Sequence, residues 1–307
     1  MNKLFVIASV ICVVFAYCYP VHSAPLYWAK THQGIDNEVN CTQITSDGEI
    51  LLAGYKHTAE GENSSFWVFK QDGDGNVLWE KTYGAIDTAR AYAIQKTPDD
   101  NYVVAGTHGS TDMLLVKLDG NGAIIWQKTY YIGRNIGISS LITISEGGYV
   151  LTGDIYSLGS MWMDVFIMKI DNDGNVVWTK QYGRADKDAF DHPTSIIETV
   201  EGNYVVGGTT NSFGLNGDVF VMNLDSNGNI IWQKTYGAFY GEVAESIVQT
   251  NDGGLVIACI QGYNPARGNL WLLKLGGDGA ISWQKVYVRE NPIYLYSFKK
   301  TVDDGFI

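Results

Sequence analysis

The segment Asn76-Val-Leu-Trp-Glu-Lys-Thr-Tyr-Gly84 returns almost unchanged as Asn229-Ile-Ile-Trp-Gln-Lys-Thr-Tyr-Gly237. Its tryptophan belongs to a series that recurs every 47 to 54 residues: Trp28, Trp79, Trp126, Trp178, Trp232 and Trp283. Self-similarity at a period of this size is typical of solenoids, propellers and arrays. The sequence therefore predicts a repeat protein built from units of about 50 residues.

Each unit is predicted to form four short strands. In one unit they lie at residues 139–145, 149–153, 164–170 and 176–182. Two turns rich in glycine, asparagine and aspartate separate them in pairs, Glu146-Gly147-Gly148 and Asp171-Asn-Asp-Gly-Asn175, which is hairpin chemistry. Four antiparallel strands in each unit predict an all-β protein, a β-propeller of four-stranded blades.

The repeat also predicts how the blades follow one another along residues 25–307. Five complete blades are expected, and the end of the chain, Thr301 to Ile307, matches the start of a blade at Thr250 to Val256. We therefore expect a truncated sixth blade and a fragment of a six- to eight-bladed ring. The strand around Trp28 is of the type that ends a blade, so it is expected to close the ring. Small residues recur at one place in the first strand of each unit: Cys41, Ala93, Ser140, Ser195, Ser246 and Ser297.

Residues 1–24 have the pattern of a secretory signal peptide. Lys3 precedes an apolar run from Leu4 to Tyr19, and small residues follow at Ser23 and Ala24. We expect a secreted or extracytoplasmic protein with no membrane span after cleavage. Two cysteines then remain, Cys41 and Cys259, and they fall in different blades, which predicts unpaired thiols.

The charge of the chain limits its partners. A formal net charge of −12 and a pI near 4.8 argue against nucleic acid, which requires a basic stripe, and against anionic lipid. An acidic surface instead favours a soluble exported protein, which we expect to be a monomer.

The segment Leu118-Asp119-Gly-Asn-Gly122-Ala-Ile-Ile-Trp126 resembles the tryptophan-docking motif of quinoprotein-type (PQQ-like) propellers, with one residue fewer between its Asp and Gly. Units with Trp-x-Lys-Thr-Tyr-Gly are similar to the tandem propeller repeats of exported bacterial and archaeal proteins. Two units depart from the pattern, with Gly276 in place of the Asp and Cys259 in place of a glycine. The quinoprotein resemblance implies a pyrroloquinoline quinone enzyme. The adjacent cysteine pair and the calcium-ligand set of those enzymes are not present in the sequence, so neither the cofactor nor the catalysis is expected.

Other motifs give no catalytic or metal site. The turns Asp72-Gly-Asp-Gly-Asn76 and Asp171-Asn-Asp-Gly-Asn175 offer oxygen ligands for calcium, but the twelfth position of such a loop is Tyr83 or Tyr182 instead of glutamate. A glycine-containing hairpin turn is the favoured interpretation. The histidines are scattered and form no metal-binding pair, and no nucleophile elbow or phosphate loop is found. We expect no cofactor and no metal.

Function is expected where the repeat breaks, in the long connections that emerge on one face of the propeller. The candidate ligand-binding residues are Tyr131, Arg134, Trp162, Asp186, Asp188, Asp191, His192, Tyr240, Tyr263 and Arg267. Trp162 is the one tryptophan of residues 25–307 outside the repeat registers, and an exposed aromatic beside acidic groups suits a sugar ring or a protein partner. The leading hypothesis is a non-catalytic exported propeller that binds a protein or a glycan at the cell exterior.

Two other functions stay open. One is an enzyme with its site over the central channel (a lyase, a glycosidase or a quinoprotein-like enzyme), for which Asp186, Asp188 and Asp191 form the densest acidic segment. The other is a purely structural cell-surface module.

Overall fold

A computed structural model describes residues 37–57, 63–84, 88–156, 162–183, 190–212, 217–237, 241–262 and 268–288, together with 295, 297–301, 303 and 305–307. The side chain of Arg134 is the one exception within these ranges. The described residues form twenty strands in five four-stranded antiparallel sheets, and no helix. Each sheet is a simple meander in which consecutive strands pair, so each is one blade.

The blades are numbered in chain order. Blade 1 consists of β1 (Glu38–Ile44), β2 (Ile50–His57), β3 (Ser64–Gln71) and β4 (Val77–Tyr83). Blade 2 consists of β5 (Ala89–Lys96), β6 (Tyr102–His108), β7 (Asp112–Leu118) and β8 (Ile124–Tyr131). Blade 3 consists of β9 (Arg134–Thr143), β10 (Tyr149–Tyr156), β11 (Met163–Ile170) and β12 (Val176–Tyr182).

The last two blades repeat this arrangement. Blade 4 consists of β13 (Asp191–Glu198), β14 (Tyr204–Thr210), β15 (Asp218–Leu224) and β16 (Ile230–Tyr236). Blade 5 consists of β17 (Glu242–Gln249), β18 (Leu255–Gln261), β19 (Asn269–Leu275) and β20 (Ile281–Tyr287).

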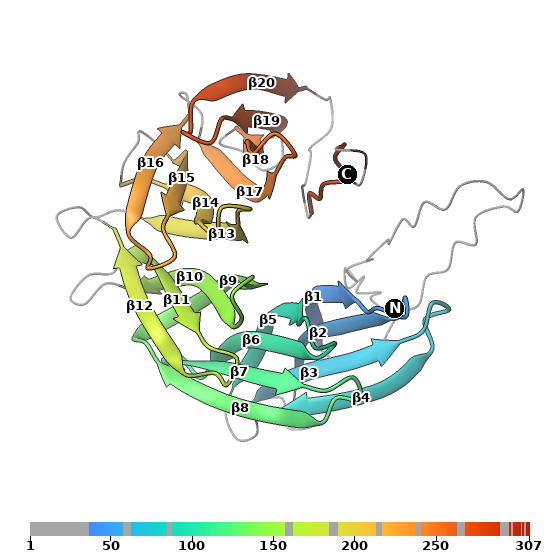
Figure 1. The fold of residues 1–307 in the computed structure, drawn as a ribbon. Helices are drawn as coiled ribbons and strands as arrows, with labels where there is room; N and C mark the ends of the chain where they lie inside the picture. The colour runs from blue at the N-terminus through green and yellow to red at the C-terminus, as the bar shows by residue number, and fades with distance from the viewer. Residues whose placement is uncertain are drawn as a thin grey trace, which may run out of the picture.

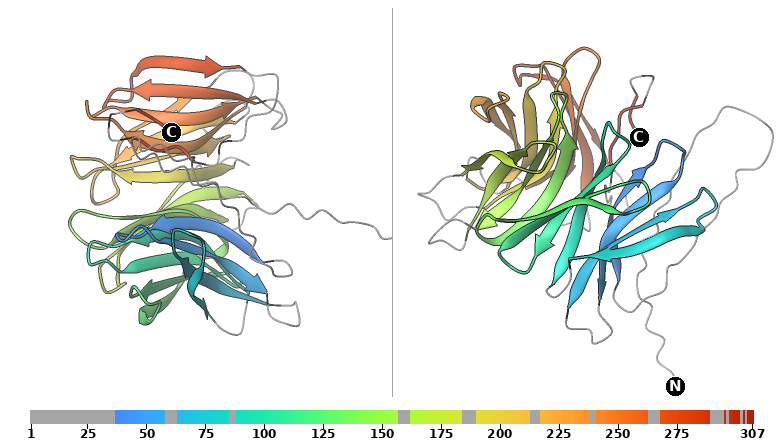
Figure 2. Two further views of the ribbon diagram at one scale, coloured as in Figure 1. Left: turned by 90° about the vertical axis from the view of Figure 1, so that its right-hand side faces the viewer. Right: turned by 60° about the horizontal axis from the view of Figure 1, so that its bottom comes forward.

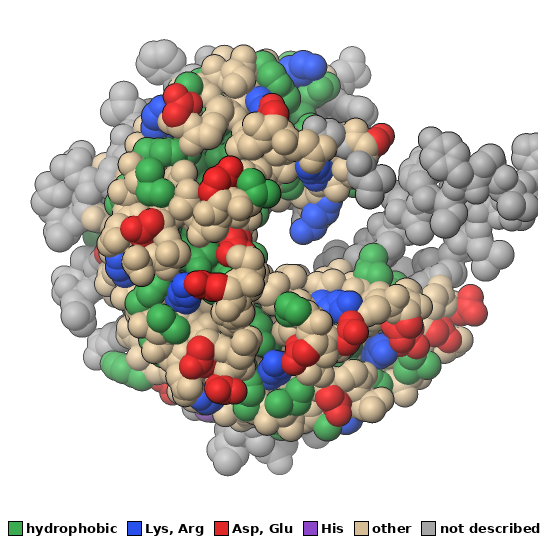
Figure 3. Space-filling model, in the orientation of Figure 1, with side chains coloured by type: hydrophobic (Ala, Val, Ile, Leu, Met, Phe, Trp, Pro, Cys, Tyr) green, Lys and Arg blue, Asp and Glu red, His purple; other side chains and the backbone are tan. Residues whose placement is uncertain are grey.

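The blades follow one another around a central axis, with the first strand of each blade innermost and the fourth at the rim (Figure 1). The turns that join the first strand to the second and the third to the fourth lie on one side of the disc, which we call the short-turn face (Figure 2). The opposite side, where the second strand ends and the third begins, is the long-loop face. The described blades occupy an arc around a central opening (Figure 3).

The core lies between adjacent blades because the middle two strands of each blade are buried on both sides. In β6, Tyr102, Val103, Val104 and Ala105 are at most 3% exposed, and they pack in two separate clusters with the blades before and after. The rim strands alternate between partly buried and exposed residues. This pattern is expected of strands that are covered from both sides in the interior of the blade and from one side at the rim.

Every inner strand contains a register shift next to the small residue of the repeat. In blade 2 the pairing of β5 with β6 skips one residue, Tyr92, between Ala91 and Ala93. The glycine opposite the shift has no room for a side chain, since a Cβ on Gly106 would lie 2.0 Å from the Arg90 carbonyl oxygen. The repeated glycine of the second strand in blades 1 to 4 therefore leaves room for the β-bulge in the first, whereas blade 5 has its bulge opposite Cys259.

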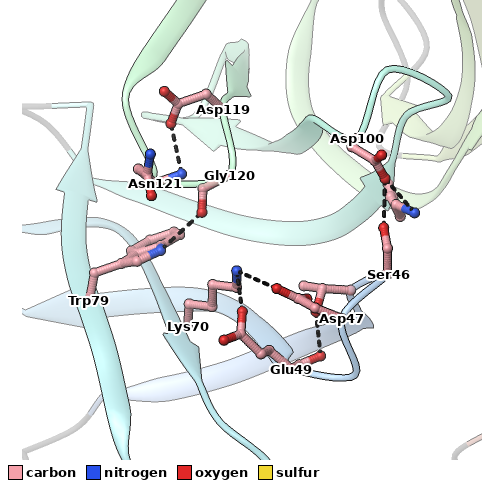
Figure 4. A network of polar contacts seen from close by, with 11 residues as sticks. Ser46, Asp47, Glu49, Lys70, Trp79, Asp100, Asp119, Gly120 and Asn121 are labelled. Carbon is pink, nitrogen blue, oxygen red and sulfur yellow. Dashed lines mark hydrogen bonds and ion pairs between the residues drawn. The ribbon is translucent and has the colours of Figure 1, made fainter.

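Four of the repeat tryptophans dock on the next blade. The Trp79 indole donates its Nε1–H to the carbonyl oxygen of Gly120, 3.2 Å away in the turn before β8 (Figure 4). The other indoles do the same one blade further on, at 2.9 to 3.2 Å: Trp126 to Asn172, Trp178 to Ser226, and Trp232 to Gly277. These contacts join consecutive blades at the rim.

The aspartate-rich turns use their carboxylates to close the turn. Asp119 Oδ1 accepts hydrogen bonds from the backbone N–H groups of Asn121 and Ala123. Both carboxylate oxygens of Asp72 accept hydrogen bonds, from the N–H groups of Asp74 and Asn76 and from the Asn76 amide. This is the Asx-turn chemistry of a hairpin, in agreement with the hairpin interpretation of these segments.

The expected all-β propeller architecture is confirmed, whereas the signal peptide and the Trp28 strand lie outside the described residues. Where a sixth blade is predicted to begin, one antiparallel bridge joins Lys300 to Phe306, and Phe298 packs against blade 5. Cys41 and Cys259 are both unpaired. Within the described residues, no helix is long and apolar enough to cross a membrane.

Candidate ligand site at the channel mouth

Six of the ten ligand-binding residues predicted from the sequence can be placed only in part or not at all. Five of them lie outside the described residues: Asp186, Asp188, Tyr240, Tyr263 and Arg267. Arg134 begins β9, but its side chain is not described.

Trp162 and Tyr131 are exposed on the long-loop side of the disc. Trp162 directly precedes β11 and is 40% exposed, and Tyr131 ends β8 and is 76% exposed. Both therefore lie at the strand ends where the repeat varies. An exposed tryptophan at such a place offers a flat apolar surface together with an N–H donor.

Asp191 lies in the interior, contrary to the loop position that we expected. It is the first residue of β13 and is 1% exposed. Its carboxylate accepts hydrogen bonds from the Thr210 hydroxyl at 2.5 Å and from the Ser212 hydroxyl at 2.7 Å. Burial raises the pKa of Asp191, although these two hydrogen bonds oppose the shift. This aspartate fastens the end of β14 to β13 and is not available to a ligand.

His192, the next residue, faces a different partner. Its Nδ1 lies 3.0 Å from Oδ1 of Asp154, which comes from β10 in the preceding blade and is 7% exposed. The imidazole also stacks on Phe190, with 5.7 Å between the ring centroids and 16° between the planes. An ionised carboxylate can only accept, so Nδ1 carries the proton and Nε2 presents its lone pair. Two contacts thus fix the orientation of a half-exposed imidazole.

Glu245 of β17 adds a second carboxylate from the following blade. It occupies the bulge between Ala244 and Ser246 and is half-buried. Burial raises the pKa of Glu245, and the nearby His192 charge partly opposes that shift. A backbone hydrogen bond from Ile247 to the Ser195 hydroxyl joins β17 to β13 close by. Asp154 and His192 are therefore paired at the long-loop end of the axis, which we call the channel mouth, and Glu245 of the next inner strand is near enough to interact electrostatically with His192.

These three residues break the repeat, each at its own position. The residues in register with Asp154 are Tyr55, Thr107, Thr209 and Ile260. Those in register with His192 are Glu38, Arg90, Gly137 and Val243. Those in register with Glu245 are Asn40, Tyr92, Ser139 and Thr194. None of the three side chains is repeated at its position in another blade, so the scaffold does not require them.

Gly137 makes the Asp154–His192 pair possible. A Cβ at this residue of β9 would lie 2.5 Å from Oδ1 of Asp154. In blades 1 and 2 the same position carries Glu38 and Arg90, whose side chains occupy the mouth themselves. The glycine of blade 3 therefore leaves the space that the Asp154 carboxylate fills.

The side of the mouth formed by blades 1 and 2 has a different character. The Tyr55 hydroxyl donates to Glu38 at 2.8 Å, and the Arg90 guanidinium lies 4.6 Å from the centroid of the Tyr55 ring. The hydrogen bond to Glu38 is the main cause of the raised pKa of Tyr55. This side carries a cation–π pair, whereas the side formed by blades 3 to 5 carries the two carboxylates and the imidazole.

The short-turn face, by contrast, repeats the same contacts in most of the blades. Its charges of both signs are interspersed (Figure 3). A buried lysine of the third strand pairs with an acidic residue of the first turn in four blades: Lys70 with Glu49, Lys117 with Asp99, Lys169 with Glu146, and Lys274 with Asp252. Ser46 joins blade 1 to Asp100 of blade 2 on the same face (Figure 4). Because these contacts recur, they belong to the scaffold.

The channel-mouth cluster offers acceptors and one proton-transfer group to a ligand. Nε2 of His192 accepts or transfers a proton, and the Glu245 carboxylate accepts hydrogen bonds. Among the residues that the structure describes, no three His, Cys, Asp or Glu side chains are grouped so as to hold a metal ion. His192 was among the residues predicted from the sequence, whereas Asp154 and Glu245 were not. Both could be found by aligning the blades and looking for titratable residues at positions of the first and second strands that vary from blade to blade.

The comparisons with known proteins bear on the fold. No family model and no curated protein sequence matches the chain. A Dyadobacter fermentans protein of unknown function is similar in structure, with a TM-score of 0.59, 10% identity and 87% of each chain covered. A Bacteroides caccae protein of unknown function has a TM-score of 0.54 at 17% identity, covering 84% of this chain and 85% of its own.

A third similar structure has an assigned activity. It is the periplasmic gluconolactonase PpgL of Pseudomonas aeruginosa, with a TM-score of 0.54 at 12% identity, covering 82% of this chain and 70% of its own. At this level of identity the likeness concerns the fold alone. Together with the five four-stranded sheets, these neighbours show that the chain has a propeller-like fold.

Proposed function

We propose that this protein is an exported recognition protein that binds a protein or a glycan on its long-loop face, over the channel mouth. The observation that carries the proposal is the contrast between the two faces. The short-turn face repeats the same lysine–carboxylate pairs, whereas the long-loop side brings together unrepeated residues, among them His192, Asp154 and Glu245. Variable groups on a rigid scaffold are where binding is usually found.

The exposed aromatics of the same face support the proposal. Trp162 and Tyr131 expose large side chains at the ends of strands in blades 2 and 3. Tryptophan and tyrosine are over-represented among the residues that dominate binding energy, because they remove a large apolar area from water and keep a polar contact. Export follows from the pattern of residues 1–24 and is part of the proposal.

A binding screen on the intact exported chain tests this function. The protein is applied to an array of polysaccharides and to purified extracellular proteins, and Trp162→Ala is run in parallel. We expect a ligand whose affinity falls about tenfold or more in the variant, as for a central aromatic contact. Trp283→Ala is the matched control, since Trp283 is 37% exposed but lies on the rim strand β20.

The two variants separate a binding role from a general effect. Equal losses in both, or unchanged binding in Trp162→Ala, place the ligand elsewhere and contradict the proposal. The thermal unfolding midpoint of each variant shows whether the fold is intact.

The Asp154–His192 pair also supports a second candidate function, an enzyme with its site at the channel mouth. A carboxylate that orients an imidazole is the arrangement of a general base, and Glu245, whose pKa is raised by burial, has the character of a general acid. Turnover of p-nitrophenyl glycosides and esters that is lost in His192→Ala but kept in Thr194→Ala is the expected result. Equal rates in both variants count against catalysis by this pair.

A further inference from the structure

Two carboxylates at the channel mouth, those of Asp154 and Glu245, form no ion pair with a lysine or arginine of the described residues, and Arg90 on the other side of the mouth lies over the Tyr55 ring instead. Asp154 is almost fully buried and Glu245 is half-buried, and neither is ion-paired with a lysine or an arginine. The described lysines that pair with carboxylates do so in other places, on the short-turn face or with Glu80 at the rim. Carboxylates removed from water without a counter-charge are costly, and a bound cation relieves that cost.

The strands packed around His192 determine the local charge. β10 supplies Asp154, β17 supplies Glu245, and β9 has Gly137 beside the Asp154 carboxylate. Phe190 covers one face of the imidazole. Asp191 is directed away, toward its two hydroxyl donors on blade 4. With the imidazole neutral, the cluster holds two carboxylates, an aromatic face and the Nε2 lone pair, and all of these attract a cation.

We propose that the Asp154–His192–Glu245 cluster receives the cationic side chain of a protein partner, a lysine ammonium or an arginine guanidinium, inserted into the channel mouth. The proposal rests on the recognition function above and names the chemistry of its central contact. The carboxylate of Glu245 and Nε2 of His192 accept hydrogen bonds from the bound nitrogen, and Asp154 holds the imidazole in the accepting tautomer. The overall charge of −12 favours approach of such a basic partner.

A protein side chain is favoured over other cations by the surface around the mouth. Trp162 and Tyr131 are exposed on the same face at the ends of outer strands, where they offer a protein partner apolar contacts in addition to the charged one. The position of the cluster at the start of the inner strands β13 and β17 suits a long side chain that reaches toward the axis from above.

The cation and protons compete for the same site, so the affinity for the cation should fall as the pH is lowered. Protonation of Glu245 removes an acceptor for the bound cation, and burial raises the pKa of this carboxylate. Affinity for a cationic probe therefore falls as the pH is lowered from 8 to 5, by roughly tenfold for each proton taken up per pH unit.

The test uses small probes and the full mature chain, with no partner required. Nα-acetyl-lysine amide and Nα-acetyl-arginine amide are titrated at pH 8 while the His192 ring signals are followed by NMR. We expect saturable shifts with millimolar affinity, and none with the uncharged norleucine amide. Glu245→Gln, which keeps the shape of the side chain, is expected to weaken binding about tenfold, the usual effect of losing one charged hydrogen bond.

Glu38→Gln is the matched control, because this carboxylate lies at the same mouth but accepts a hydrogen bond from Tyr55. Its expected change is less than about twofold. Absence of any His192 shift up to 50 mM probe, or equal weakening in Glu245→Gln and Glu38→Gln, overturns the assignment. A shift with glucosamine and none with the two amino-acid amides overturns the protein side chain as the source of the cation.

The outcome also separates this inference from the recognition function. If a ligand from the binding screen depends on Trp162 but the amides leave His192 unchanged, the recognition function stands and the cation assignment fails. If the amides bind and no ligand depends on Trp162, the cation assignment stands and the recognition function fails.

Discussion

Removing Trp178 tests the docking of one blade on the next. Its indole donates to Ser226 at 3.2 Å, and Lys180 lies over the ring with its nitrogen 5.9 Å from the centroid. Taking about 150 Å² of buried apolar area at about 25 cal/mol per Å² gives about 4 kcal/mol. The lost hydrogen bond adds about 1 kcal/mol. Since the ring is partly exposed, Trp178→Ala is expected to lower the free energy of unfolding by about 3–5 kcal/mol.

Trp283→Ala provides the comparison within the same protein. Trp283 holds the same register in blade 5 but is 37% exposed, and its indole donates to no acceptor within the described part of the chain. Its removal is expected to cost only about 1 kcal/mol. Equilibrium urea unfolding followed by far-UV circular dichroism measures both, since this signal does not depend on the deleted fluorophore. A cost below about 1 kcal/mol for Trp178→Ala, or equal costs for the two variants, refutes the docking argument.

Three further predictions concern a turn, the acid stability and a buried carboxylate. Gly122→Ala is expected to lower the thermal unfolding midpoint clearly, because Gly122 has a φ of +73° and a Cβ there would lie 2.8 Å from the Trp79 ring. Gly120→Ala in the same turn meets open space and should change the midpoint little. The hydrogen bond from Lys274 lowers the pKa of Asp252 well below 3.8, so the stabilisation from this pair is present above pH 3.8 and is lost as the pH falls below it. Asp252→Asn should flatten the acid side of a plot of the thermal unfolding midpoint against pH. An unchanged plot counts against a stabilising Lys274–Asp252 pair. Asp191→Ala should lower the free energy of unfolding in urea by about 1–3 kcal/mol, because two hydrogen bonds are lost, and should leave ligand affinity unchanged. A loss of affinity without a loss of stability would show that Asp191 belongs to the ligand site.

The blade architecture was predictable from the sequence because the docking residues have to recur. Each blade needs a tryptophan that reaches the next turn and a glycine at which that turn bends, so Trp126 and Gly174 stand in the same relation as Trp79 and Gly122. Repetition at a fixed period makes such requirements visible in one sequence.

The channel mouth was only partly predictable, for a geometrical reason. Asp191 and His192 adjoin in the sequence, and both were assigned to an exposed loop, yet successive residues of a strand point to opposite sides. Asp191 therefore enters the interior, where donors from residues 210 and 212 meet it, and His192 faces Asp154. Glu245 lies in a β-bulge, where the alternation of sides is interrupted and the sequence pattern no longer tells which way a side chain points.

The central claim is that recognition takes place at the channel mouth on the long-loop face, and paired surface variants test it most directly. The affinity of a ligand identified in the binding screen is measured for the double variant Trp162→Ala/Glu245→Gln and for Asp119→Asn/Asp173→Asn, whose changes lie in turns of the opposite face. We expect a loss of affinity of at least about tenfold in the first protein and less than about twofold in the second, with both proteins folded. A ligand that loses affinity only with the second protein would place recognition on the short-turn face and contradict a site at the channel mouth.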